Sequence, residues 1–111
     1  MGRQAEINFR INLDHDQMPS KIEWNATDSK GGDPQNCEAM LISLWDNQTK
    51  NTLGIDLWTK QMLIDDMNIF VYQTLNKLAE TYNKATNDKD TANIISNCAA
   101  EVAEKLNLLN K

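Results

Sequence analysis

Two short apolar segments near the middle of the chain decide the fold: EAMLISLW, residues 38–45, and TLGIDLWT, residues 52–59. Each alternates its side chains between two faces, as a β-strand does, and six polar residues separate the two segments. If Trp45 pairs with Thr52 in an antiparallel hairpin, one face gathers six apolar side chains: Met40, Ile42, Leu44, Leu53, Ile55 and Leu57. This face is predicted to be the centre of the core, buried beneath the apolar stripes of two helices.

The opposite face of this predicted hairpin is also apolar. It carries Trp45, Trp58 and Leu41 together with one carboxylate, Asp56. Two interpretations of the tryptophans stay open: burial under a loop or helix end, or a contact surface, because Trp is enriched among binding hot spots. We expect a second copy of the chain or a partner protein to cover this strip, and Asp56 favours a basic or amide-rich contact. The candidate partner-binding residues are therefore Leu41, Trp45, Asp56 and Trp58.

Two further strands are predicted upstream of the hairpin. Apolar and polar residues alternate from Ala5 to Leu13 and again from Ile22 to Ala26, which is the period of a strand with one wet face. The connection between them contains Pro19, which a central strand does not tolerate. Residues 27–36 are rich in Gly, Pro and small polar side chains and are predicted to form the longest loop.

The periodicity changes to that of a helix from about Asp65. Asn87 and Asp88 interrupt the apolar stripe, and a second helix is predicted to begin near Asp90. Asp65 or Asp66 is expected to cap the first helix and Asp90 the second, because a carboxylate accepts hydrogen bonds from the unpaired N–H groups there. The chain is thus predicted to be one α+β domain, residues 1–111, with a four-stranded antiparallel sheet followed by two C-terminal helices packed on one face.

Composition limits the classes of function. The 111 residues are 41% hydrophobic and 24% charged, as in ordinary globular domains, and carry a formal net charge of −5. This charge disfavours nucleic-acid binding, since phosphate backbones repel an acidic surface. No run approaches the roughly 18 apolar residues of a membrane-spanning helix, and the N-terminal residues lack the features of a secretory signal. With only two cysteines, predicted to be free thiols, a cytoplasmic location without membrane insertion is expected.

No catalytic or metal-binding constellation is apparent. His15, the only histidine, stands between Asp14 and Asp16 in a predicted turn and has no nucleophile or second ligand nearby. Cys98 lies on an apolar helical stripe and is predicted to be a small core residue. Residues 28–33 do not fit the ligand spacing of a calcium loop. The chain is therefore expected not to be an enzyme and to need no cofactor or metal.

Several segments carry a family resemblance. IEWNATD (22–28), AMLISLWD (39–46), TLGIDLWTKQM (52–62) and ATNDK (85–89) occur in the same order as in the GldC family of gliding motility proteins, which the chain resembles over essentially its whole length. This resemblance implies an accessory protein of bacterial gliding with no known catalytic motif. The expected function is a non-catalytic adaptor that contacts other gliding motility proteins from the cytoplasmic side; whether it forms homo-oligomers is left open.

The order of the elements gives an alternative. Four strands followed by two helices is similar to the topology of SecB-type export chaperones. This resemblance implies a holder of unfolded export clients, which requires a broad apolar groove rather than one defined patch.

Overall fold

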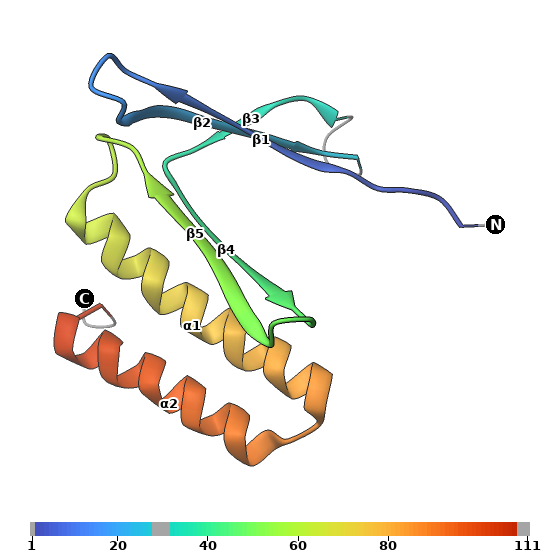
Figure 1. The fold of residues 1–111 in the computed structure, drawn as a ribbon. Helices are drawn as coiled ribbons and strands as arrows, with labels where there is room; N and C mark the ends of the chain where they lie inside the picture. The colour runs from blue at the N-terminus through green and yellow to red at the C-terminus, as the bar shows by residue number, and fades with distance from the viewer. Residues whose placement is uncertain (1, 28–31, 109–111) are drawn as a thin grey trace. The chain divides into compact units, whose positions relative to one another are not determined.

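The chain folds into two compact units that divide between Met62 and Leu63. The computed structural model describes residues 2–27 and 32–108. Within these residues the first unit contains the strands and the second unit contains two helices (Figure 1). The predicted α+β class and the two C-terminal helices are confirmed.

The first unit begins with an antiparallel sheet in the order β1 (Ile7–Leu13), β2 (Pro19–Ala26) and β3 (Gln35–Cys37). The predicted hairpin of the first two strands is confirmed, with Phe9 opposite Trp24. Ile22, on β2, is fully buried. The first two residues of β3, Gln35 and Asn36, fall in the segment that the sequence predicted to be a loop, so this end of the loop prediction is wrong.

The turn between β1 and β2 is built on Asp14. Its Oδ1 accepts the backbone N–H groups of Asp16 at 2.9 Å and Met18 at 3.0 Å. The Nζ of Lys60 lies 2.8 Å from its Oδ2 and so ties the turn to the segment that follows the last strand. The Lys60 ammonium, together with the Met18 N–H, holds the pKa of Asp14 below its usual value.

The second sheet is the hairpin of β4 (Ala39–Asp46) and β5 (Asn51–Trp58). Its register places Trp45 opposite Thr52 and continues without a break to Ala39 opposite Trp58, which confirms the predicted pairing. Asp46 closes the turn: its C=O accepts the N–H of Lys50 at 2.9 Å, and its carboxylate accepts the Thr49 hydroxyl at 2.7 Å. Lys50 completes the turn in the left-handed region with a φ of 58°.

The expectation of one four-stranded sheet is wrong, because the strands form a three-stranded and a two-stranded sheet. Only Glu38 separates β3 from β4, so the sequence contains what looks like a single long strand. The register of β2 on β3 places Ile22 opposite Cys37; continued in steps of one residue, it reaches Pro19 opposite Met40. Since β2 begins at Pro19, it has no residues left to pair with the rest of β4.

Thr59 fixes the open end of the second hairpin. This residue is only 1% exposed. Its N–H donates to the C=O of Glu38 at 2.9 Å, and its hydroxyl donates to the Glu38 carboxylate. The same hydroxyl oxygen accepts the N–H of Gln61 at 3.3 Å. A buried hydroxyl with these partners extends the pairing by one residue beyond β4 and β5.

The predicted core of this hairpin is only partly buried. Met40 is buried, and Ile42 and Leu57 are half-buried. By contrast Leu44 is 53% and Ile55 47% exposed, so the first unit does not bury them by itself. A two-stranded sheet covers neither of its own faces, which accounts for the exposure. Packing of the helices on this face stays a prediction.

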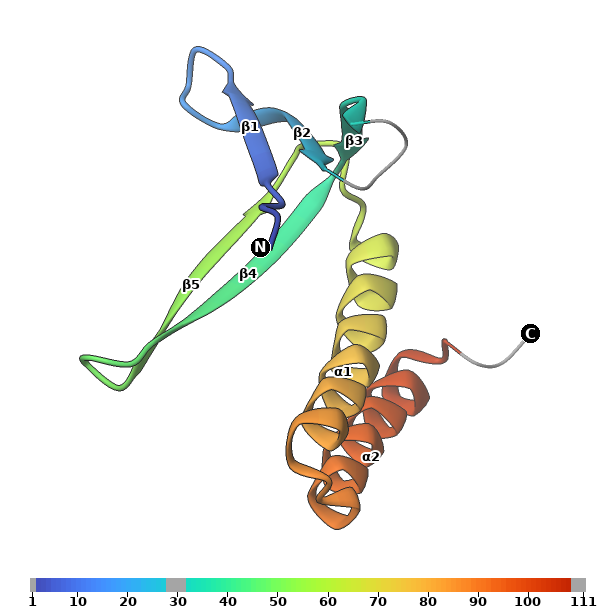
Figure 2. The same ribbon diagram turned by 90° about the vertical axis from the view of Figure 1, so that its right-hand side faces the viewer.

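The second unit is a helical hairpin of α1 (Ile64–Thr86) and α2 (Lys89–Leu106), whose helices lie side by side (Figures 1 and 2). Four of its alanines are buried: Ala79, Ala92, Ala99 and Ala103. Small side chains let helix backbones approach closely, so these alanines form the centre of the contact. Cys98, predicted to be a core residue, is exposed because the neighbouring Ala99 points inward instead.

The connection between the helices is two residues long. Asn87 ends α1 in the left-handed conformation (φ 58°) and donates its N–H to the C=O of Asn83 at 2.8 Å. Asp88, not Asp90 as predicted, is the N-cap of α2: its carboxylate accepts the N–H of Thr91 at 3.1 Å and the Thr91 hydroxyl at 2.6 Å. At α1 the N-cap is Leu63 without a side-chain hydrogen bond, so Asp65 and Asp66 act only through the helix dipole.

Replacement of Asp88 tests this cap. Hydrogen bonds from Thr91 lower the pKa of Asp88 below its ordinary 3.8, so the ionised carboxylate stabilises the folded state above that pH. This stabilisation is lost as the pH falls through the lowered pKa. We expect Asp88→Ala to lower the melting temperature at neutral pH, measured by circular dichroism. Asp88→Asn should flatten the loss of melting temperature on acidification. An equally large effect of Asp90→Ala would contradict the assignment of the cap.

Replacement of Thr59 tests the closure of the hairpin. Thr59→Val keeps the shape of the side chain but leaves buried polar groups without their partner. We expect the free energy of unfolding to fall by about 1–3 kcal/mol in urea titrations. Thr52→Val, the same change at an exposed strand position, should stay within about 0.5 kcal/mol of the wild type. Equal effects of the two substitutions would show that Thr59 does not fix the hairpin.

Candidate functional site

One face of the second hairpin gathers all the residues that the sequence singled out for partner binding. Side chains of opposed residues point to the same side of a sheet, and alternate residues along each strand share that side. The register therefore places eight residues on what we call the tryptophan face: Ala39, Leu41, Ser43, Trp45, Thr52, Gly54, Asp56 and Trp58. Leu41 lies directly opposite Asp56, and Trp45 and Trp58 lie toward opposite ends of the face.

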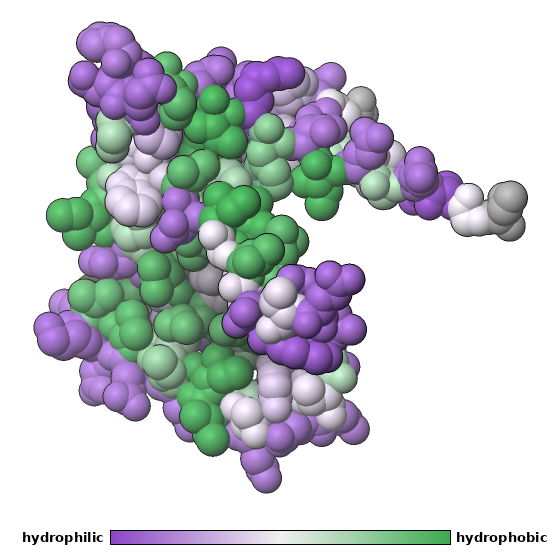
Figure 3. Space-filling view, viewed as in Figure 1, coloured by the Kyte–Doolittle hydropathy of each residue, from purple (hydrophilic) through white to green (hydrophobic). Residues whose placement is uncertain are grey.

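The rest of the first unit leaves the tryptophan face uncovered. Trp45 is 62%, Trp58 55% and Leu41 50% exposed. Of the two interpretations of the tryptophans, burial under a loop of the first unit is therefore not what the structure shows. Figure 3 shows hydrophobic side chains at the molecular surface on the side seen in Figure 1. Large apolar side chains gathered on one face, as Leu41, Trp45 and Trp58 are, are typical of interaction sites.

A shallow hollow of about 310 Å³ lies in the middle of this hairpin. Ser43 and Gly54 oppose each other there, so neither residue of this pair has a large side chain. A Cβ atom built on Gly54 would meet only the C=O of Ile42, at an ordinary 3.9 Å, so the hairpin itself does not require glycine. A glycine inside a strand often marks the close approach of another molecule. The sequence analysis passed over this pair, although the predicted register already placed the two residues together.

The chemistry of the tryptophan face suits binding. Its indoles and Leu41 offer apolar area, the Trp side chains also offer N–H donors, and Asp56 offers a carboxylate acceptor. The face carries no histidine, cysteine or lysine. These groups can bury an apolar side chain and orient a donor beside it.

One family of known proteins matches this chain. The family described as "Gliding motility-associated protein GldC-like" matches residues 19–108. The chain belongs to this family. The GldC-like match runs from β2 to the end of α2 and includes the whole tryptophan face, which confirms the resemblance predicted from the sequence. Searches of curated proteins and of solved structures found no match.

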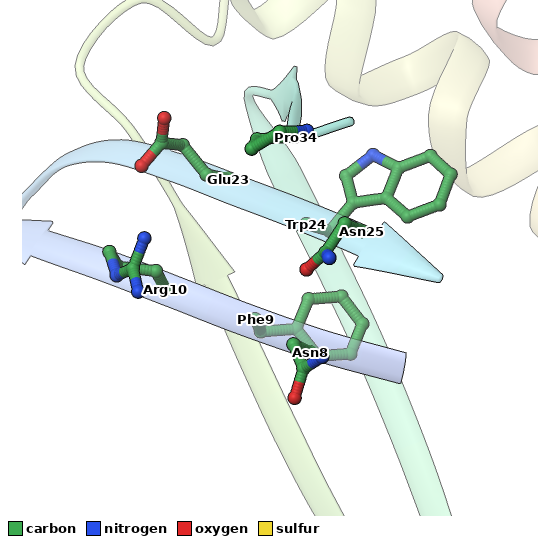
Figure 4. A pocket seen from close by; sticks show the side chains of 7 residues that line it. All are labelled: Asn8, Phe9, Arg10, Glu23, Trp24, Asn25 and Pro34. Carbon is green, nitrogen blue, oxygen red and sulfur yellow. The ribbon is translucent and has the colours of Figure 1, made fainter. Parts of the chain in front are cut away.

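A second hollow of this GldC-like chain lies on the first sheet (Figure 4). Arg10 and Glu23 oppose each other there, and Asn8 opposes Asn25, whose side-chain amide donates to the C=O of Gly32 at 3.1 Å. Its volume is about 60 Å³, room for a few water molecules only. A substrate or cofactor needs a far larger cavity, so this hollow is not an active-site candidate.

The remaining candidate groups are not assembled into a site in the described part of this GldC-like protein. No set of three His, Cys, Asp or Glu side chains there is placed to hold a metal ion. Of the segment compared with a calcium loop, residues 28–31 lie outside the described residues. Cys37 and Cys98 are free thiols, and burial raises the pKa of Cys37, which disfavours its thiolate. No helix of the described residues combines the length and apolarity needed to cross a membrane.

His15 offers a direct test for a metal requirement. The Asp14 oxygens beside it accept backbone N–H groups and the Lys60 ammonium, as expected of a structural turn. We expect addition of EDTA, and separately His15→Ala, to leave the melting temperature unchanged within error. A fall in melting temperature on chelation, reversed by zinc or calcium, would contradict this expectation.

Proposed function

We propose that this GldC-like protein is a non-catalytic adaptor of the gliding motility apparatus that binds another component through its tryptophan face. Membership of the family supports an association with gliding motility. The observation that carries the proposal is the joint exposure of Trp45, Trp58 and Leu41 on one face of a two-stranded sheet. We place this contact on the cytoplasmic side, as the sequence features suggest.

The side chains of this face define what a partner must offer. The hollow between Ser43 and Gly54 accommodates an apolar side chain, flanked by Leu41 along β4. Asp56 is exposed among apolar groups, and a partner that covers them would exclude water from its carboxylate, which strengthens a charge pair there. A lysine, arginine or amide on the partner is the complement to this carboxylate. The formal net charge of −5 adds an attraction for a basic surface.

Trp58 is the residue with which to test the proposed function. We expect Trp58→Ala to abolish or strongly reduce colony spreading when it replaces the wild type in a gliding bacterium that depends on its GldC-like protein. Loss of one interfacial Trp commonly costs 2 kcal/mol or more of binding, a roughly 30-fold loss of affinity. Leu53→Ala is the matched control: Leu53 is on the same strand, faces the opposite side and is 54% exposed against 55% for Trp58.

Both variants must first show wild-type circular dichroism and expression. Wild-type spreading by a folded Trp58→Ala protein would overturn the proposal, as would an equal loss in both variants, since the effect would then not belong to this face. Purified protein should also fail to prevent aggregation of a panel of unfolded proteins. Broad suppression of aggregation would contradict an adaptor and favour a chaperone that holds unfolded clients.

A further inference from the structure

The β4–β5 hairpin leaves both of its outer backbone edges without a strand partner in the described residues. The N–H of Thr59 donates to the C=O of Glu38, which makes these two a hydrogen-bonded pair in the same register as the strands. Hydrogen-bonded and non-hydrogen-bonded pairs alternate along an antiparallel ladder, so every second residue directs its N–H and C=O outward. These outward residues include Leu41, Ser43 and Trp45 on β4, and Thr52, Gly54 and Asp56 on β5.

Neither edge carries the usual protection against pairing with another chain. Natural edge strands are blunted by Lys, Pro, bulges or short length. β4 and β5 each have eight residues, contain no Lys or Pro and pair without a bulge. β5 has one charge near its middle, Asp56, whereas β4 has none from Ala39 to Trp45. The β4 edge is thus long, uncharged and apolar. β2 pairs only with β3 and does not continue along this edge.

We propose that β4 pairs with β4 of a second copy of this chain, antiparallel and across a twofold axis at Ser43. In this register Ser43 lies opposite Ser43 of the second copy, and Leu41 lies opposite its Trp45. Leu41, Ser43 and Trp45 direct their N–H and C=O outward. In this register the outward groups of one copy therefore form hydrogen bonds with the same outward groups of the other copy. Between them, Ile42 lies opposite Leu44 of the second copy, which pairs apolar side chains on the other face as well.

Charge and shape favour a second copy as the occupant of this edge. The five residues from Leu41 to Trp45 are uncharged, so two copies meet there without repulsion. The corresponding pairing of β5, with the twofold axis at the outward residue Gly54, would place Gly54 opposite Gly54 and Asp56 opposite Thr52 of the second copy, so it would bring two carboxylates into the seam and pair no large apolar side chains on the tryptophan face. The β4 pairing keeps Asp56 on the outer strand of each copy, where a charge protects the new edge.

The pairing turns two hairpins into one sheet in the order β5, β4, β4, β5. Opposed residues share a side, so the two tryptophan faces become one continuous surface. A row of small residues then crosses its centre: Gly54 and Ser43 of one copy followed by Ser43 and Gly54 of the other. This inference concerns the edge and does not rest on the proposed adaptor function, so either can fail without the other.

Proline substitutions at the two edges test the proposal in the full-length protein. Wild type should have twice the monomer mass of 12.6 kDa by light scattering across a micromolar dilution series. The Ser43 N–H points away from β5, so Ser43→Pro removes only an outward donor and should give the monomer mass. Gly54→Pro is the matched control, because Gly54 lies directly opposite and its N–H points to the other edge; it should remain dimeric.

Charge substitutions at the same position provide a second test that does not depend on proline. Ser43→Lys and Ser43→Glu should each be monomeric, since like charges would oppose each other at the twofold axis. Mixing the two variants should restore the dimer mass, while Thr52→Lys should not change it. A monomeric wild type would overturn the proposal and leave the edge to an extended segment of another protein. Retention of the dimer by Ser43→Pro and both charge variants would overturn it equally.

Discussion

A two-stranded antiparallel sheet has no interior, so the β4–β5 hairpin cannot bury the apolar side chains on either of its faces by itself. Asp46 fixes its register at the turn and Thr59 fixes it at the open end through Glu38. With the register fixed, alternation places apolar side chains on both faces, and the first unit leaves Trp45 and Leu53 more than half exposed. Covering this apolar surface lowers the free energy of the system, which is the physical basis of the proposed adaptor role.

The pairing of the hairpin was predictable from the sequence. The sequence contains two strictly alternating segments joined by a short polar connection. Only one register of these segments matches their large apolar residues, and in the structure Ile42 lies opposite Ile55 as that register requires. The same register placed Leu41, Trp45, Asp56 and Trp58 on one face. The helices followed from the change of period, and α1 and α2 lie within a few residues of their predicted limits.

The division into two sheets was not predictable, because it depends on where one strand stops relative to another. Alternation continues from β3 into β4, and only the register of β2 reveals that its pairing stops at Ile22 opposite Cys37, before β4 begins. The N-cap of α2 is Asp88 and not the predicted Asp90, because α1 ends at Asn87 in the left-handed conformation and α2 begins two residues later. The sequence also assigned Ile55 to the core, since alternation identifies a face without showing what covers it.

Hydrogen exchange of individual backbone amides tests most directly whether the hairpin is covered from outside. The informative amides are the outward N–H groups of Leu41, Ser43 and Trp45, which have no strand partner within the described chain. In the native protein the account predicts slow exchange at these three positions, with faster exchange at the outward amides of β5. Rapid exchange along β4, as fast as at Gly54 and Asp56, would contradict the account.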